Sequence, residues 1–256
     1  MTMTTLEDKH ALVTGGGSGI GAAITFALAQ AGAQVTICGR RAEELELTAE
    51  RHPNIHVQTA DVTDTVSIGS LYRTAQKARG QFAIVVANAG TAESAPAEKV
   101  SPELWHKTLD TNLTGAFFSV QPALAAMREK KWGRIVFIAS TAGLKGYPYV
   151  AHYVAAKHGV VGLARALAAE TAKDGVTVNA ICPGFTETSL LDRAVDRIAE
   201  RTRISETEAR KALVSHNPQG RFIQPQEVAD AVVWLCQEGS GAITGQAISV
   251  SGGETW

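Results

Sequence analysis

Short runs of aliphatic and β-branched residues alternate with longer helix-forming stretches along the whole chain, and this alternation restricts the fold more than any other feature. Strands are predicted at Ala11–Thr14, Gln34–Cys38, His56–Thr59, Phe82–Ala87, Arg134–Ala139, Val176–Ile181 and Ala247–Val250. Helices are predicted between them at about Gly19–Ala31, Ala42–Arg51, Val66–Arg79, Pro102–Lys130, Ala151–Thr171 and Gln226–Cys236. Runs such as "FAIVVA" are apolar on both faces, as in parallel strands covered by helices on each side. The pattern predicts an α/β fold, a doubly wound parallel sheet of Rossmann type with about seven strands.

The composition fits a single globular domain. The chain has 256 residues, of which 45% are hydrophobic and 19% charged, so it can bury a sizeable core. We interpret residues 1–256 as one domain. Residues 184–225 interrupt the alternation with a polar stretch that has helical pieces and no strand, which predicts a lid-like insertion beside a site.

The charge and the cysteines exclude several classes of protein. Lys and Arg number 24 against 25 Asp and Glu, and there is no long basic run, so neither nucleic-acid nor membrane-surface binding is predicted. The stretch "MTMTTLEDKH" lacks the apolar core of a signal peptide, and no apolar run reaches the ~18 residues of a membrane span. Cys38, Cys182 and Cys236 are predicted to be buried reduced thiols of a cytoplasmic protein. No histidine pair has metal-ligand spacing, and no metal site is predicted.

The sequence "TGGGSGIG" follows the first predicted strand and opens directly into a helix. Glycines at such a junction let the chain turn tightly and let a pyrophosphate approach the backbone, while the helix N-terminus offers free N–H groups to the anion. A glycine-rich turn alone is also a common strand-to-helix connection, but its place at the first junction of a βαβ unit favours dinucleotide binding. The predicted cofactor residues here are Gly15, Gly17, Ser18, Gly19, Ile20 and Gly21.

The end of the second strand indicates which nicotinamide cofactor is bound. An acidic residue at this place holds the ribose hydroxyls of NAD, but here the sequence is "ICGRRAEE", with Gly39 where the acid is expected. Arg40 and Arg41 follow, and guanidinium groups pair well with a 2′-phosphate. We therefore predict NADP(H) in preference to NAD(H). Asp61, in "ADV", is expected either to accept a hydrogen bond from the adenine or to cap the next helix.

Tyr153 and Lys157 stand four residues apart in the apolar helix "AHYVAAKHGV". Residues at this spacing lie on one helix face, so the pair is either an ordinary amphipathic edge or two groups directed at one point. A phenol with a pKa of ~10 is a poor proton-transfer group near neutral pH unless a cation stabilises its anion. Lys157 is in position to be that cation.

Four motifs in order resemble the short-chain dehydrogenase/reductase family. They are "TGGGSGIG", "ANAG" (87–90), "YVAAK" (153–157) and "CPG" (182–184), and the resemblance extends from about Leu6 to Gly253. It implies a catalytic set of Ser140, Tyr153, Lys157 and Asn112. In that set Tyr153 donates the proton and Ser140 binds the substrate oxygen. Lys157 lowers the pKa of Tyr153 and holds the nicotinamide ribose, and Asn112 holds a water that relays protons to Lys157.

The same resemblance implies further contacts. Val62, Asn88, Ala89, Gly90, Pro183, Gly184, Thr186 and Thr188 are expected to contact the cofactor together with Asp61, Tyr153 and Lys157. Thr186 stands where the family often has an aliphatic residue. The expected substrate contacts are Ser140, Ala142, Tyr147, His152 and Gly184. Tyr147 would either close over an acyl chain or pack its loop, and His152 would either line the substrate mouth or be exposed.

Stretches such as "VNAICPGFTET" resemble reductases of 3-oxoacyl thioesters, carried by coenzyme A or a carrier protein, and polyketide ketoreductases. The resemblance implies NADPH-linked reduction of a ketone, with a 3-oxoacyl thioester or a similar β-keto compound as substrate, and a homotetramer in which helices 102–130 and 151–171 pair with their mates. One alternative is an NAD(P)-dependent dehydrogenase of a secondary alcohol, 3-hydroxybutyrate or a 3-hydroxyacyl-CoA. Another is a dinucleotide-binding sensor or scaffold without catalysis.

Overall fold

The computed structural model describes residues 6–256, so half of the N-terminal stretch discussed above lies outside the described residues. Its centre is a seven-stranded sheet with the order β3-β2-β1-β4-β5-β6-β7, in which every neighbouring pair is parallel. The strands are β1 (His10–Thr14), β2 (Gln34–Gly39), β3 (Ile55–Thr59), β4 (Ile84–Ala87), β5 (Gly133–Ile138), β6 (Val176–Pro183) and β7 (Ala247–Val250). The predicted doubly wound sheet is confirmed, with strand ends that differ from the prediction by no more than two residues.

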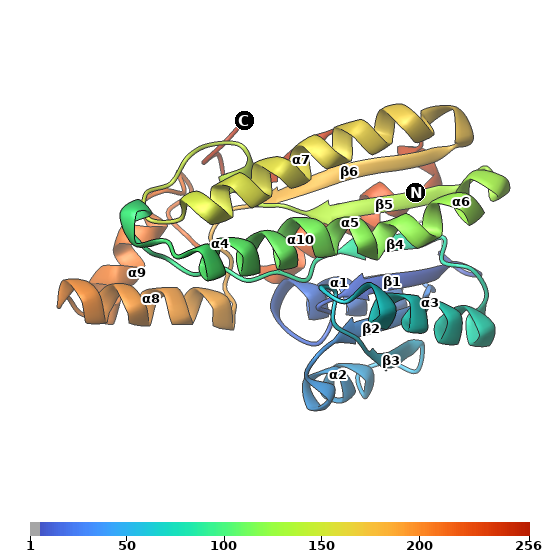
Figure 1. The fold of residues 1–256 in the computed structure, drawn as a ribbon, viewed down its shortest axis with the longest axis horizontal. Coiled ribbons are helices and arrows are strands. Elements are labelled where there is room, and N and C mark those ends of the chain that lie inside the picture. Colours follow the sequence, from blue (N-terminus) through green and yellow to red (C-terminus); the bar gives the residue numbers. More distant parts are fainter. Residues whose placement is uncertain (1–5) are drawn as a thin grey trace.

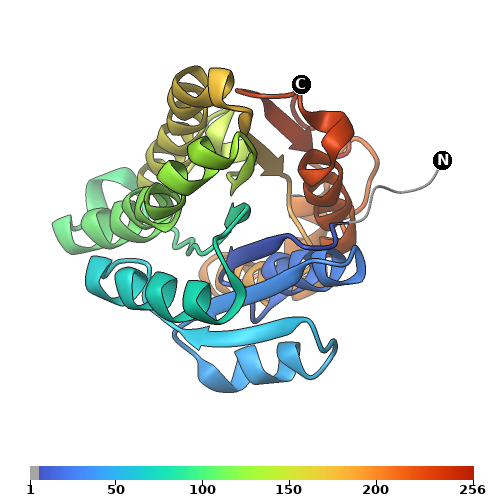
Figure 2. The same ribbon diagram turned by 90° about the vertical axis from the view of Figure 1, so that its right-hand side faces the viewer.

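Helices cover both faces of the sheet (Figures 1 and 2). On one face lie α1 (Gly19–Gln30), α2 (Ala42–Ala49) and α10 (Pro225–Cys236), whose apolar residues form a core with the strands. On the other lie α3 (Thr65–Arg79), the α4–α6 segment and α7 (Ala151–Thr171). Strand order reverses between β1 and β4, and at such a switch point the loops after the two strands diverge and leave room for a ligand.

The segment predicted as one helix over 102–130 is interrupted twice. It consists of α4 (Pro102–Leu109), a π-helical turn η2 (Asp110–Thr114), α5 (Gly115–Val120), a 3-10 turn η3 (Gln121–Ala123) and α6 (Leu124–Lys130). Pro122 cannot donate an intrahelical hydrogen bond, which explains the second break. The first break is the π turn, which contains Asn112; such turns are frequent at functional sites.

The predicted insertion at 184–225 contains two helices, α8 (Ser189–Thr202) and α9 (Glu206–Val214), which project to the left in Figure 1. They share a small apolar core of their own, formed by Leu191, Val195, Ala209 and Phe222. A single β-bridge, Thr186 with Ile223, closes its base. The insertion is therefore a helical subassembly attached at the carboxyl end of β6.

Two tryptophans on helices, one on α4 and one on α10, are partly exposed. Trp105 is 39% and Trp234 45% exposed. Amphipathic spacing does not reveal whether a helix flank is covered by the same chain. The three cysteines are buried and free, as predicted. None of the helices within residues 6–256 combines the length and apolarity that crossing a bilayer would require.

Candidate active site

The glycine loop connects β1 to α1 by a very close backbone approach. Gly15 has a left-handed φ of 65°, and a Cβ at Gly21 would lie 2.0 Å from the Gly15 carbonyl oxygen. The Ser18 side chain does not cap α1, so N–H groups of the first turn are available to an anion. The Asn88 amide donates to the carbonyl oxygens of Thr14 and Gly15 at 2.9 and 3.2 Å. These features fit the pyrophosphate of a dinucleotide.

Arg40 is the accessible cation at the end of β2. Its side chain is 77% exposed, and its guanidinium lies 3.9 Å from Asp61. Arg41, by contrast, forms an ion pair with Glu44 in the first turn of α2. Of the two arginines predicted to meet a 2′-phosphate, Arg40 is therefore the one without a close partner among the described residues.

Asp61 does not cap the following helix. Its carboxylate accepts from the backbone N–H and hydroxyl of Thr63, which hold its pKa below the usual value, and Asp64 caps α3 instead. That alternative was wrong, because α3 begins at Thr65, four residues after Asp61, and its N-cap is Asp64. Val62 is 7% exposed and packs in the core against Gly115, so its side chain faces inward.

The loop after β4 is tied to the glycine loop. The Thr14 hydroxyl accepts from the backbone N–H groups of Asn88 and Ala89, both at 3.0 Å. Gly90 follows, and a Cβ there would lie 2.7 Å from the Asn112 side-chain oxygen. The predicted residues Asn88, Ala89 and Gly90 thus lie together with the glycine loop at the switch point.

Ser140, Tyr153 and Lys157 meet at the carboxyl end of β5. Ser140 begins a 3-10 turn, η4 (Thr141–Gly143), and its hydroxyl accepts from the Ala142 N–H at 3.1 Å. It also interacts with the Tyr153 hydroxyl. Lys157 is buried, donates to the Ile138 carbonyl at 2.8 Å, and has its ammonium 5.6 Å from the centroid of the Tyr153 ring. The spacing that left two interpretations open at the sequence level therefore brings both groups to one point.

Burial is the largest influence on the pKa values of Tyr153 and Lys157. It raises the pKa of Tyr153 to about 12, an effect that the hydrogen bond with Ser140 opposes. It lowers the pKa of Lys157 to about 8, while the nearby Cys182 acts in the opposite direction. The expected lowering of the Tyr153 pKa by Lys157 is not found: desolvation raises this pKa, and the opposing contribution comes from Ser140.

Asn112 is 1% exposed, and its side chain has three protein partners. Its oxygen accepts from the Thr91 N–H at 3.2 Å, and its amide donates to the carbonyls of Thr91 and Thr108, each at 3.0 Å. Both amide protons are used, so the side chain joins the loop after β4 to the π turn. The predicted relay through Asn112 stays a prediction.

The segment after β6 crosses towards the glycine loop. Pro183 ends the strand, and the Gly184 N–H donates to the Val250 carbonyl at 3.1 Å. The Thr186 hydroxyl donates to the Gly184 carbonyl oxygen, and the Thr188 hydroxyl donates to the Thr186 carbonyl oxygen. A Cβ at Gly19 would lie 3.1 Å from the Thr188 methyl. The start of the insertion therefore lies directly over the N-terminus of α1.

Of the predicted substrate residues, His152 is the one that lies apart from the others. Ala142 is buried within η4. His152 is fully buried, so the exposed alternative was wrong; it faces α4 and lines a pocket of about 370 Å³ with Trp105 and Val100. Neither ring nitrogen of His152 has a hydrogen-bond partner among the described residues. It thus lies on a different side of α7 from the Tyr153 hydroxyl.

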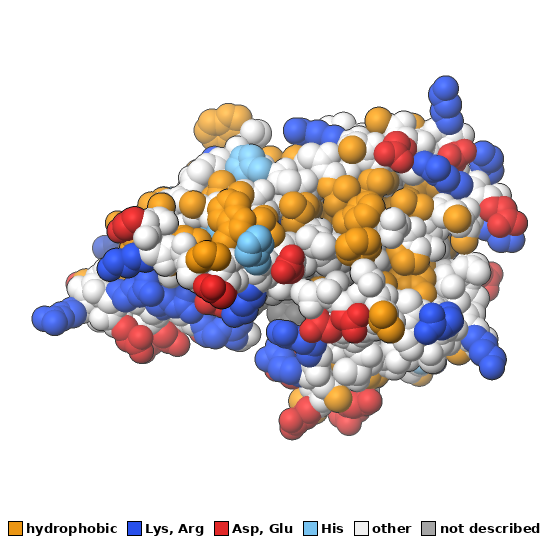
Figure 3. All heavy atoms as spheres, viewed as in Figure 1, with side chains coloured by type: hydrophobic (Ala, Val, Ile, Leu, Met, Phe, Trp, Pro, Cys, Tyr) orange, Lys and Arg blue, Asp and Glu red, His pale blue; other side chains and the backbone are white. Residues whose placement is uncertain are grey.

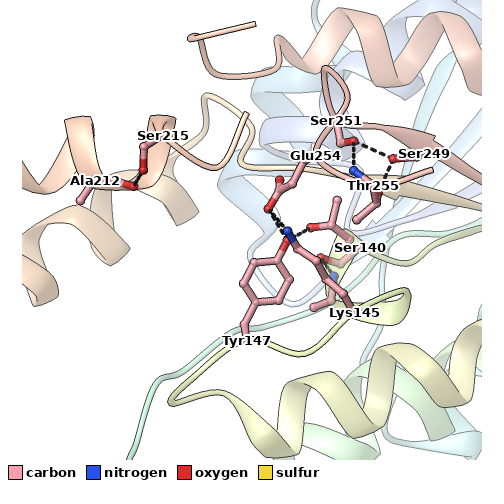
Figure 4. A network of polar contacts seen from close by, with 11 residues as sticks. Ser140, Lys145, Tyr147, Ala212, Ser215, Ser249, Ser251, Glu254 and Thr255 are labelled. Carbon is pink, nitrogen blue, oxygen red and sulfur yellow. Dashed lines mark hydrogen bonds and ion pairs between the residues drawn. The ribbon is translucent and has the colours of Figure 1, made fainter. Parts of the chain in front are cut away.

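The sequence offered no signal for a carboxylate at the substrate side of the site. Glu254, near the C-terminal end of the sequence, has a side chain that is only 1% exposed and lies 3.1 Å from the Lys145 ammonium. Its carboxylate also accepts from the Tyr147 hydroxyl (Figure 4). Tyr147 therefore packs its loop through a polar network, and 107 positions of sequence separate it from its acceptor.

The family model for short chain dehydrogenases matches residues 9–199. The chain belongs to the short-chain dehydrogenase family. The resemblance carried by the four motifs is therefore confirmed. This dehydrogenase is an oxidoreductase that interconverts CH–OH and C=O groups, and its glycine loop fits the nicotinamide dinucleotide that such chemistry uses.

Relatives of the dehydrogenase cover almost its whole length. It is 39% identical to an acetoacetyl-CoA reductase of Rhizobium meliloti over 96% of this chain and 98% of the relative. It is 38% identical to a D-beta-hydroxybutyrate dehydrogenase of Cupriavidus necator, over 97% and 98%. A crystal structure of a variant of actinorhodin polyketide ketoreductase with NADPH superposes with a TM-score of 0.93 at 38% identity, over 96% and 97% of the two chains.

Proposed function

We propose that this dehydrogenase reduces the ketone of a 3-oxoacyl thioester, or a similar β-keto compound, to a secondary alcohol with NADPH. The observation that carries the proposal is the convergence of Ser140, Tyr153 and Lys157 at the carboxyl end of β5, on the same edge of the parallel sheet as the glycine loop after β1. The likeness to an acetoacetyl-CoA reductase and to a polyketide ketoreductase supports the β-keto class of substrate.

Each side chain has a defined task in the proposed reduction. NADPH, when bound, supplies the hydride. The Ser140 hydroxyl binds the ketone oxygen and stabilises the negative charge that develops there. Tyr153 then gives its phenolic proton to that oxygen, and the Lys157 ammonium stabilises the tyrosinate that is left. The alcohol is released, and Tyr153 regains a proton from solvent.

The ionisation of Tyr153 favours the reductive direction. With a pKa of about 12, the phenol is protonated throughout the neutral range, which is the form that donates. Oxidation of an alcohol needs the tyrosinate instead, so burial disfavours that direction near pH 7. A phenol is still acidic enough to protonate an alkoxide.

Selectivity for NADPH over NADH belongs to the proposal. The end of β2 has Gly39 in place of an acid, so no carboxylate at that position repels a 2′-phosphate. Arg40, exposed and 3.9 Å from Asp61, is the side chain that would bind it. Asp61 would then meet the ribose or adenine side of the cofactor. In the same proposal Thr188, Thr186 and Gly184 bind the nicotinamide end.

The surroundings of the site support two further parts of the proposal. The insertion begins over the N-terminus of α1, at Thr188, so α8 and α9 are proposed to close over bound ligands. Hydrophobic side chains gather over α4 and α7 on the face seen in Figure 3, with Trp105 39% exposed. We propose that these helices pair with other subunits in a cytoplasmic homotetramer.

A second candidate is oxidation of a 3-hydroxy acid such as 3-hydroxybutyrate, favoured by the likeness to a D-beta-hydroxybutyrate dehydrogenase. The end of β2 has Gly39 where an acidic residue would bind the ribose of NAD, which weighs against NAD as the cofactor of such an oxidation. A sensor or scaffold would have no use for the complete proton-transfer set, which weighs against that interpretation.

The direct test is the initial rate of NADPH oxidation with acetoacetyl-CoA, with NADH and with 3-hydroxybutyrate plus NAD as parallel reactions. The proposal expects turnover in the first reaction and little in the others. Tyr153→Phe should abolish turnover and leave NADPH affinity nearly unchanged. Turnover of 3-hydroxybutyrate alone would favour the second candidate, and NADPH binding without turnover of any ketone would contradict both.

A further inference from the structure

Glu254 is a buried acid at the edge of the active site that the proposed mechanism does not use. Its only ion-pair partner among residues 6–256 is Lys145, which is 37% exposed. One carboxylate oxygen bonds the Tyr147 hydroxyl and Lys145, and the other has no partner among the described residues. A buried carboxylate oxygen without a donor is costly, so its retention calls for an explanation.

The Tyr147 hydroxyl has two oxygen neighbours, Glu254 Oε1 and, at 2.7 Å, Thr141 Oγ1. A phenol has one proton, and a carboxylate is the stronger acceptor, so Tyr147 donates to Glu254 and receives a hydrogen bond from Thr141. The directions agree with the ionisation of Tyr147: burial and Glu254 raise its pKa, whereas Thr141 lowers it. The network is thus a directed chain from Thr141 through Tyr147 to Glu254.

Each end of this chain touches a loop that carries the reaction. Thr141 directly follows Ser140 and begins the turn whose Ala142 N–H donates to the Ser140 hydroxyl. At the other end, a Cβ at Gly184 would lie 3.1 Å from the free oxygen of Glu254. The carboxylate therefore spans the loops after β5 and β6, between the proton-transfer residues and the predicted nicotinamide contact.

The segment that carries Glu254 is itself held on both sides. The Ser249 hydroxyl hydrogen-bonds those of Ser251 and Thr255 at 2.7 and 2.6 Å (Figure 4). A Cβ at Gly252 would lie 2.1 Å from the side chain of Asn217, so the segment packs closely against the end of the insertion. The Tyr147 ring also contacts Phe185 and His216, with centroids 6.3 and 6.0 Å away.

We propose that Glu254 is a positioning residue for the reduction: through Tyr147 and Thr141 it fixes the turn that presents Ser140 to the substrate oxygen. The inference rests on the proposed function for the role of Ser140. The Lys145 ammonium, 3.1 Å from the carboxylate, balances the charge of Glu254. The network reaches the cofactor site only at Gly184 and does not touch the glycine loop or Arg40, so we expect it to act mainly on turnover and little on cofactor affinity.

The test is a double-mutant cycle between Glu254→Gln, which keeps the shape and removes the charge, and Tyr147→Phe, which keeps the ring and breaks the chain. Displacement of a catalytic group by about 1 Å can cost on the order of 100-fold in rate. We expect each single variant to lower kcat by about tenfold with NADPH affinity within about twofold of wild type. The double variant should be no slower than the slower single one.

The matched control is Glu238→Gln, a carboxylate that accepts from the Trp132 indole far from Ser140, and it should leave kcat unchanged. A kcat for Glu254→Gln within twofold of wild type, or multiplicative losses in the cycle, would overturn the inference. If Glu254→Gln does not fold, Tyr147→Phe alone must show the loss in kcat, and normal turnover there overturns it equally. The cycle is measured on whichever ketone the wild type reduces, so failure with acetoacetyl-CoA would refute the proposed substrate and leave this test intact.

Discussion

Replacing Arg40 with alanine tests the basis of cofactor selection. Arg40 is the exposed cation at the end of β2, whereas Arg41 is paired with Glu44. A charge-assisted hydrogen bond is worth ~1.5–3 kcal/mol when both groups are well held. Because the Arg40 side chain is 77% exposed, solvent and salt weaken the interaction, and we expect the low end of that range.

A loss of about 1.5 kcal/mol corresponds to an affinity for NADPH that is about twelve-fold weaker, at about 1.4 kcal/mol per factor of ten. NADH has no 2′-phosphate, so its affinity should change by less than twofold. Asp61 adds to the contrast, because removing Arg40 leaves that carboxylate near the phosphate without its counter-charge at 3.9 Å. The ratio of the two affinities should therefore fall by about an order of magnitude.

The assay is quenching of protein fluorescence by NADPH and by NADH at low and at high salt, together with kcat/KM for each cofactor. The wild-type preference should weaken as salt rises, because exposed charges are screened. Arg41→Ala is the matched control and should have the smaller effect. Equal losses for both cofactors in Arg40→Ala, or a larger effect in Arg41→Ala, would refute the assignment of Arg40 to the 2′-phosphate.

The glycine loop, Lys157 and His10 each support a further prediction. Gly21→Ala should destabilise the fold by roughly 1–3 kcal/mol and abolish NADPH binding, because the new Cβ would lie 2.0 Å from the Gly15 carbonyl oxygen. The control is Gly69→Ala, whose Cβ would meet only the end of the Arg73 side chain. Both variants are compared by thermal unfolding and by titration with NADPH. Reduction should slow about tenfold per pH unit above pH 8, where Lys157 with its pKa of about 8 loses its proton; a flat rate up to pH 10 would contradict this. Burial lowers the pKa of His10 from 6.5 to about 4. Between these pH values the unfolded state binds a proton at His10 and the folded state does not. Roughly 3 kcal/mol of the folding stability present above pH 6.5 should therefore be lost as the pH falls to 4. Urea midpoints at the two pH values should show this loss in the wild type and not in His10→Gln.

The sheet and the placement of Tyr153 and Lys157 on one helix could be predicted because both depend on local signals. Strands of parallel sheets are apolar on both faces and alternate with helices, so seven runs predicted the seven strands that the structure contains. Tyr153 and Lys157 lie on one helix, and their relation follows from helical geometry. The glycine loop is a local turn whose backbone requires glycine.

What could not be predicted depends on contacts between distant segments. His152 was expected at the substrate mouth or at the surface, but α4 covers it, and no local pattern identifies which helix packs there. The expected single helix over 102–130 contains a π turn, and the Asn112 side chain in that turn hydrogen-bonds Thr91, a residue distant in sequence. The pKa of Tyr153 is raised by a degree of burial that only the packed structure specifies.

Residues near the C-terminus illustrate why a family resemblance leaves part of a site open. Motifs identify the side chains to which the proposal assigns the proton transfer, such as Ser140 and Tyr153. The wall opposite them is built by segments that need only fill space and satisfy polar groups, so the shared chemistry does not dictate its residues.

Here that wall contains a buried carboxylate, Glu254, joined to Tyr147 and Lys145. Because a buried charge tolerates few neighbours, it restricts what the adjacent loops after β5 and β6 can contain more than an apolar residue would. Substrate selection in this dehydrogenase should therefore depend on the C-terminal segment as well as on the insertion, and substitutions at Lys145 and Tyr147 should alter the range of accepted ketones more than substitutions in α2 or α3.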